Sequence, residues 1–207
     1  MKIGFVHDEF SSKAAAVLLL PLFLCFPAVR AMPQQNKTIN WTMSLQNVKS
    51  GDSIPFSAAV KSRTGEQFRI LIQPETGCFC YMIAESPGGE DVAVLLAGPL
   101  KGGEIWYSPI LELSAPSGTE SFFIITSREE QKALVQRIAA FKDNSGSAQK
   151  RALMNEIFRV RSETSKFKEA PEKPVLMGGA ARGTPEKNQG VEFSGLETYV
   201  KTISIEH

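Results

Sequence analysis

The sequence predicts a mainly β protein: an antiparallel β-sandwich, immunoglobulin-like or related, with an appended two-helix hairpin and a C-terminal strand that returns to the sheet. Three observations predict this fold class. Between residues 38 and 127, short segments rich in Val, Ile, Phe and Thr alternate with turn residues, as is typical of sandwiches and barrels. Two segments with helical spacing follow, and the 207-residue chain ends in another β-rich segment. The composition, 43% apolar and 22% charged, is that of an ordinary globular protein.

Residues 1–31 are predicted to be a signal peptide. Lys2 and Lys13 accompany an apolar run over residues 14–29, which is shorter than the about 20 residues that a membrane-spanning helix needs. The small residues of Val29-Arg30-Ala31 predict cleavage after Ala31. We therefore expect export to the periplasm or the outside of the cell, with only transient membrane contact. An uncleaved N-terminal membrane anchor is the alternative.

The sandwich domain is predicted to span residues 38–127. Strong turn sequences, such as residues 86–90, separate its strands. Between residues 54 and 60 apolar side chains alternate, and Pro55 places this strand at a sheet edge because proline has no N–H for the ladder. The expected strands span residues 39–45, 54–60, 68–73, 78–84, 92–97, 104–108 and 120–127.

A helical hairpin is predicted over residues 128–161. Ser127 and Glu130 have the spacing of a capping box, in which the serine caps the first turn and the glutamate reaches back. The residues 143–146 break the pattern, and a second helix is expected over residues 147–160. The side chains expected to be buried are Leu134, Ile138, Phe141, Leu153, Met154, Ile157 and Phe158.

The last part of the chain is predicted to be a flexible linker, residues 162–190, followed by one C-terminal strand, residues 191–207. Prolines, glycines and scattered charges fill the linker, whereas Thr198 to Ile205 are rich in β-forming residues. We expect this strand to return to the sheet of its own chain. Donation of the strand to a partner molecule is the alternative.

The inventory of reactive side chains argues against most enzyme chemistry. The chain has two histidines, His7 in the predicted signal peptide and His207 at the last position, where fraying is usual. A histidine-dependent nucleophile or a zinc site therefore lacks its side chains, and we predict a non-enzymatic protein without a cofactor. Paired carboxylates acting on glycosides are the remaining enzymatic alternative. The net charge of +1 also argues against a nucleic-acid partner.

Cys78, Cys80 and Met82 are the one group with distinctive chemistry. Side chains two apart on a strand share a face, so these three are expected on one face, with Phe79 and Tyr81 on the other. Two thiolates and a thioether are ligands suited to Cu(I). The favoured interpretation is that all three are core residues, since cysteine and methionine bury readily.

Trp106 and Tyr107 are adjacent on a predicted strand and therefore face opposite sides. The favoured interpretation is one core residue and one edge residue, and the alternative is that one of the two rings is exposed. An exposed ring on a sandwich can stack on a sugar, so both residues are candidate ligand contacts.

The stretch from residue 45 to about residue 134 resembles family 4384 of the bacterial exported domains of unknown function. The similar motifs are Gly51-Asp52-x-Ile54 at the start of a strand, Gly77 leading into Phe79-Cys80-Tyr81, the strand 92–96, and Pro116-Ser117-Gly118-Thr119-Glu120 running into residues 123–127. The resemblance implies an exported β-rich module, often an accessory to envelope or signalling proteins in bacteria. It implies no catalytic residues.

Together these observations predict an exported, non-enzymatic β-sandwich module that binds a protein or a component of the cell envelope. A module that binds carbohydrates or small ligands through Trp106 or Tyr107 is the alternative function.

Overall fold

The structure is a computed structural model that describes residues 38–56, 60–164, 173–176 and 189–207. The predicted signal peptide and its cleavage site after Ala31 lie outside these residues. All described strands and helices belong to one unit, Asn36–His207. Neither of the two described α-helices is long and apolar enough to cross a membrane.

The first of two sheets, sheet A, is built around one long strand. Its members are β1 (Thr38–Asn47), β2 (Ser53–Ile54), β4 (Gln67–Pro74), β7 (Trp106–Tyr107), β8 (Leu111–Glu112), β10 (Lys173–Leu176) and β11 (Gln189–Leu196). The order is β10-β11-β1-β4-β7, with β2 also paired to β1 and β8 also paired to β4. All of these pairs are antiparallel.

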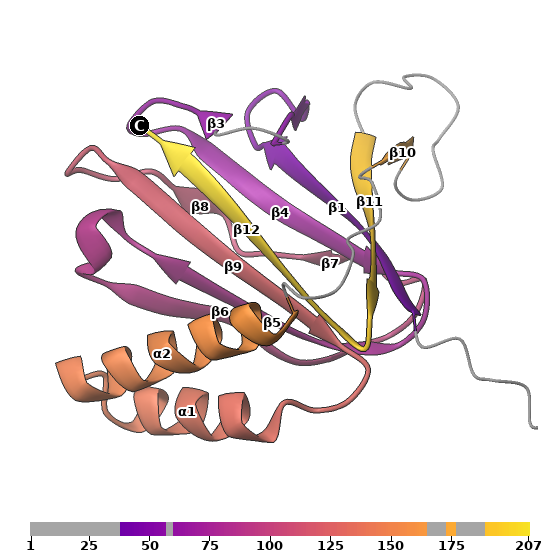
Figure 1. The fold of residues 1–207 in the computed structure, drawn as a ribbon. Helices are drawn as coiled ribbons and strands as arrows, with labels where there is room; N and C mark the ends of the chain where they lie inside the picture. Colours follow the sequence, from indigo (N-terminus) through magenta and orange to yellow (C-terminus); the bar gives the residue numbers. More distant parts are fainter. Residues whose placement is uncertain (1–37, 57–59, 165–172, 177–188) are drawn as a thin grey trace, which may run out of the picture. The chain divides into compact units, whose positions relative to one another are not determined.

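Sheet B has five strands in the order β3-β12-β9-β5-β6. They are β3 (Val60–Lys61), β5 (Cys78–Glu85), β6 (Val92–Leu100), β9 (Thr119–Ser127) and β12 (Thr198–Glu206). Only the short β3 runs parallel to its neighbour, β12; the other pairs described in this sheet are antiparallel. The predicted mainly β fold class is therefore confirmed (Figure 1).

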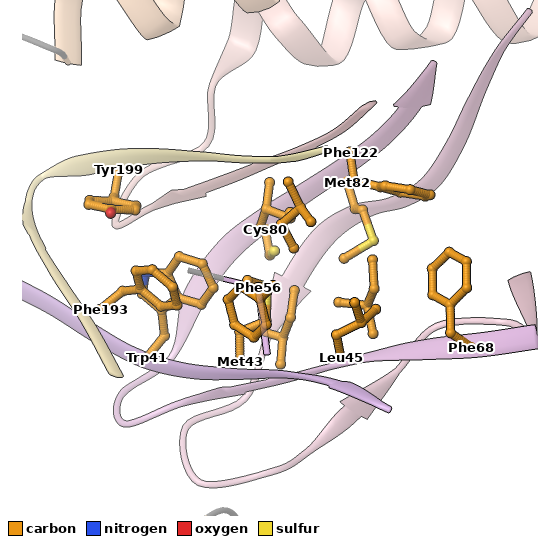
Figure 2. Packing of buried hydrophobic residues seen from close by; sticks show 14 of the residues in the cluster. Trp41, Met43, Leu45, Phe56, Phe68, Cys80, Met82, Phe122, Phe193 and Tyr199 are labelled. Carbon is orange, nitrogen blue, oxygen red and sulfur yellow. The ribbon is translucent and has the colours of Figure 1, made fainter. Parts of the chain in front are cut away.

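The two sheets face each other across an apolar core (Figure 2). Sheet A contributes the alternating side chains Trp41, Met43 and Leu45, and sheet B contributes Cys80 and Met82, all almost fully buried. The strict alternation follows from the two-residue period of a strand. Burial of one large apolar side chain of this kind stabilises the fold by about 1.5–3 kcal/mol.

Two helices cover the other face of sheet B: α1 (Lys132–Asp143) and α2 (Ser147–Thr164). Their buried residues are Leu134, Ile138, Phe141, Leu153, Met154, Ile157 and Val160. These side chains pack on Tyr81 and Ile83 of β5 and on Phe123 and Ile125 of β9. Sheet B thus lies between two apolar clusters, and the predicted hairpin packs on a sheet face (Figure 1).

The predicted capping box at Ser127 is wrong. Ser127 is the last residue of β9, opposite Thr198 in the ladder, and α1 begins only at Lys132. Sheet pairing holds Ser127 in extended backbone, so it cannot start a helix. Its hydroxyl accepts a hydrogen bond from Gln131 Nε2 at 2.8 Å, and the Gln131 backbone N–H donates instead to the Tyr81 hydroxyl at 2.9 Å.

Phe158 was expected to be buried, but 46% of it is exposed. Its ring meets Phe123 edge-on, with centroids 5.8 Å apart, so only one side of the ring touches the sheet. Val160 takes the buried position at this end of α2 instead.

The C-terminal segment returns to the sandwich as predicted, but as two strands in two different sheets. β11 pairs with β1 in sheet A, and β12 pairs with β9 in sheet B. The corner between them is Glu197, whose φ of 57° lies in the left-handed region. Gly195 beside it leaves room for the ring of Tyr199, because a Cβ at this position would lie 2.7 Å from Tyr199 Cδ2.

Several predicted boundaries also differ from the structure. The predicted linker, residues 162–190, contains the last turn of α2 and the strand β10, which pairs with β11; residues 165–172 and 177–188 lie outside the described chain. The strand expected over residues 54–60 corresponds to β2 and β3, two-residue strands in different sheets. The strand expected over residues 104–108 is reduced to β7.

Candidate functional site

Cys78, Cys80 and Met82 belong to the core cluster on the inner face of sheet B, as the strand period predicted; Figure 2 shows Cys80 and Met82 there. Both cysteines are free and buried. Burial raises the pKa of the Cys78 thiol to about 11 and that of Cys80 well above its usual range. A soft metal binds the thiolate, which this apolar surrounding disfavours, so the geometry fits the interpretation of core residues.

Within the described ranges, no three His, Cys, Asp or Glu side chains gather in a way that could hold a metal ion.

Trp106 and Tyr107 face opposite sides of sheet A. In the register of β7 with β4, Trp106 lies beside Ile72 and Tyr107 beside Leu71. Ile72 belongs to the core, and Trp106 packs partly buried against the same core. Tyr107 therefore points to the outer face, where 52% of it is exposed.

A second large apolar side chain is exposed three residues further along, since 47% of Ile110 is accessible. Ser108 fixes the chain between the two. Its hydroxyl accepts the Ile70 N–H at 3.0 Å and donates to the Pro109 carbonyl at 2.7 Å, and its own N–H donates to the Ile70 carbonyl at 2.9 Å. We call Tyr107 and Ile110 together the edge pair. Sequence periodicity missed Ile110 because it lies between two short strands.

The outer face of sheet A carries two different rows of side chains beside the edge pair. Tyr107 is followed across the sheet by Leu71 and Ser44, which are both buried, and the next row along the strands is polar, with Gln73 beside Thr42 and Thr42 beside Glu192. The buried side chains of α1 and α2 pack on sheet B. They therefore do not cover the polar row on the outer face of sheet A.

A surface pocket of about 300 Å³ lies on this face. It is lined by Asn40, Trp41, Thr42, Gln73, Pro74, Glu75, Gly103 and Glu192. Asn40 Nδ2 donates to Glu75 Oε2 at 2.6 Å, and Asn40 Oδ1 accepts the Ser194 hydroxyl at 2.7 Å. Gln73 Nε2 donates to the Gly103 carbonyl at 2.9 Å. With carboxylates and amides in its lining, the pocket suits a polar, neutral or cationic group.

The pocket could not be found from sequence spacing, because its lining comes from β1, β4, β11 and the turn after β6. Asn40, Gln73 and Glu192 are far apart along the chain, and no shared sequence motif links them. Only the pairing of β1 with both β4 and β11 brings them together.

His207 is held in place rather than frayed. Its side chain is fully buried, with Nδ1 3.2 Å from the Thr64 hydroxyl and Nε2 3.7 Å from Glu120 Oε1. Its backbone exchanges two hydrogen bonds of 3.0 Å with Gly118. The histidine therefore belongs to the packing at the end of β12 and does not line the pocket.

Comparison with known proteins gives no match: no family model, no curated protein and no solved structure is similar to this chain. The resemblance to family 4384 of the bacterial exported domains of unknown function therefore stays a prediction based on the motifs quoted above.

Proposed function

We propose that this protein is an exported, non-enzymatic module that binds a protein or a component of the cell envelope through the edge of sheet A. The observation that carries the proposal is the edge pair. Tyr107 and Ile110 expose 52% and 47% of themselves within one segment. Single exposed apolar side chains are common, but neighbouring ones form the kind of patch that binding surfaces use.

The charged residues near the edge pair indicate which kind of partner surface would fit it. Glu112 lies in the same exposed segment as Tyr107, whereas Glu104 of that segment forms an ion pair with Lys101 at 3.5 Å; Glu75 and Glu192 line the pocket on the same sheet. Complementary charge favours association. The expected partner surface is therefore apolar at its centre and carries lysines or arginines around it.

The positions of the most reactive side chains support a role without catalysis. Both described cysteines are buried with raised thiol pKa values, and His207 is enclosed at the end of β12. A nucleophile or general base has to reach its substrate, and these groups contact the protein interior instead.

Site-specific crosslinking tests the proposal. A photoreactive amino acid replaces Tyr107 in one variant and Arg151, an exposed residue of α2, in a matched control. In cell-envelope extract, a defined adduct is expected from position 107 and not from position 151. The adduct should weaken when Ile110→Ser is added. Equal adducts from both positions, or none from position 107, would contradict binding at this edge.

A carbohydrate-binding role is the second candidate, because the exposed Tyr107 ring and the polar pocket share one face of sheet A. Aromatic rings bury large areas while polar neighbours fix orientation. On a panel of envelope polysaccharides, binding should fall at least about tenfold, or about 1.4 kcal/mol, in both Tyr107→Ala and Gln73→Ala. Retention of binding by Tyr107→Ala would exclude this role.

A further inference from the structure

The outer face of sheet A carries an arginine beside the exposed Tyr107. Arg69 lies on β4 two residues before Leu71, so the two side chains share a face. Leu71 is opposite Tyr107 in the register of β4 with β7, which places Arg69 on the same face as the Tyr107 ring. On its other side, Arg69 is opposite Gln46 of β1.

The edge pair flanks the position of Arg69 along β4. β7 pairs with β4 at Leu71, and β8 pairs with it at Phe68, so the connection between β7 and β8 passes Arg69. Tyr107 and Ile110 lie at the two ends of this connection, and each is about half exposed. A group bound at Arg69 would therefore have an aromatic ring and an aliphatic side chain as neighbours.

The Arg69 guanidinium has no acceptor within the part of the chain that the structure describes. Its Nε is buried, and this atom has no hydrogen-bond partner. None of the ion pairs between described residues includes Arg69. Gln46 Nε2 donates instead to the Gly51 carbonyl at 2.9 Å. Glu112 of β8 accepts a hydrogen bond from Gln67 Nε2 at 2.8 Å.

The chemistry of the unpaired group indicates what would bind to it. A buried donor on a charged side chain is costly without an acceptor, and folded proteins rarely keep one. The Nε and Nη groups of arginine form a planar fork that matches a carboxylate through two parallel hydrogen bonds. One carboxylate would therefore satisfy both the buried Nε of Arg69 and its charge.

We infer that Arg69 binds a carboxylate of a partner protein, from an aspartate, a glutamate or a chain end, whose adjoining apolar group contacts Tyr107 and Ile110. This assignment rests on the binding that we propose at the edge of sheet A, and it adds one acidic group to the apolar centre of the partner surface. An acidic sugar offers the same carboxylate, but Ile110 has no partner for its hydroxyl groups.

Side-chain NMR of the purified protein tests this assignment with small carboxylates. N-acetylphenylalanine carries a carboxylate next to an apolar ring, and its amide is the matched neutral compound. The Arg69 Nε–H resonance, identified by its loss in Arg69→Gln, is expected to shift with the acid and to stay in place with the amide. On backbone resonances around Tyr107, Arg69→Gln should lower the affinity for the acid at least about tenfold, because a hydrogen bond to a charged group is lost.

Arg63→Gln is the matched control, because Arg63 is an exposed arginine in the turn before β4, and it should leave the affinity unchanged. Arg69→Lys keeps the charge without the fork, so it should retain only part of the affinity. An Arg69 Nε–H resonance that ignores the acid, or that responds equally to the amide, would overturn the assignment. A response to glucuronate but not to N-acetylphenylalanine would also overturn it, in favour of an acidic sugar.

The same experiments separate this assignment from the proposed function. A photocrosslinked adduct from position 107, combined with no response to the acid, would overturn the carboxylate position and leave binding at the edge of sheet A intact. A response to the acid without any adduct would support the carboxylate position and contradict the proposed partner.

Discussion

At the scale of single residues, burial changes the chemistry of the two described cysteines. The apolar core raises the pKa of Cys78 to about 11 and that of Cys80 well above its ordinary value. Reaction of a thiol proceeds through the thiolate. The fold keeps both cysteines protonated and enclosed, which would let them survive as free thiols in the oxidising compartment that the proposed export implies.

We expect Cys78 and Cys80 to resist alkylation by iodoacetamide at pH 8 in the native protein. Relative to a free thiol with a pKa near 8.5, a pKa of about 11 lowers the thiolate fraction of Cys78 by roughly two orders of magnitude at this pH. Peptide mapping measures labelling with and without guanidinium, and the native rate should rise about tenfold per pH unit below pH 11. Native labelling of Cys78 as fast as in the unfolded chain would contradict this.

At the scale of elements, α1 begins where sheet B supplies an acceptor. The Gln131 N–H at the start of the helix has the Tyr81 hydroxyl as its partner, and no side chain of the helix itself caps this end. The first N–H groups of a helix have no partner within it. A tyrosine of β5 thus fixes both the start of α1 and its position on the sheet.

Tyr81→Phe is expected to lower the free energy of unfolding by about 0.5–1.5 kcal/mol, because the Gln131 N–H loses its acceptor while the ring stays buried. Urea unfolding measures this change. Tyr107→Phe is the matched control, since the Tyr107 hydroxyl belongs to a half-exposed side chain. Equal effects of the two substitutions would show that the hydrogen bond to α1 is unimportant.

Gly195→Ala is expected to destabilise the corner between β11 and β12 by about 1–3 kcal/mol, the usual cost of overpacking. The new methyl group would lie 2.7 Å from Tyr199 Cδ2. In a Tyr199→Gly background the penalty should shrink, because the contacts with Cδ2 at 2.7 Å, Cβ at 2.9 Å and Cγ at 3.1 Å are all removed. A penalty of the same size in both backgrounds would place the cause in the backbone.

Sequence periodicity predicts those strands and helices whose own residues show a clear alternation or helical spacing of apolar side chains. Strands β4, β5 and β9 and both helices appear close to the expected positions, because their alternation or helical spacing extends over many residues. β7 and β8 have two residues each and exist only through pairing with β4. The continuous β pattern after residue 190 does not mark the change of sheet at Glu197, which depends on one backbone conformation.

The residues of the candidate site likewise fall into those that a local sequence pattern predicts and those that it does not. The opposite orientation of Trp106 and Tyr107 follows from the strand period, so the sequence alone indicates one core residue and one edge residue. The pocket and the enclosure of His207 depend on contacts between distant segments. No local pattern encodes them.

At the scale of the whole molecule, sheet B joins two cores. Its inner face packs on sheet A, and its outer face packs on α1 and α2. Loss of sheet B would expose both apolar clusters at once. The helices α1 and α2 would then have no sheet against which to bury their apolar side chains, so we expect them to unfold together with sheet B.

We expect a single cooperative unfolding transition. Both tryptophans of the chain, Trp41 and Trp106, lie in sheet A, so fluorescence reports on sheet A while circular dichroism at 222 nm reports largely on the helices. The two midpoints should coincide. Met43→Ala and Ile157→Ala, each costing about 2–5 kcal/mol, should shift both probes together, and separate transitions would show that the helices unfold independently.

The crossing of the chain from one sheet to the other at Glu197 has a consequence for biogenesis. β11 lies between β10 and β1, and β12 lies between β3 and β9, so neither sheet is complete without residues 189–206. Pairing between segments that are far apart in sequence forms slowly. The chain would therefore stay open until these residues have paired, and an open chain is the form in which the export that we propose would carry it across a membrane.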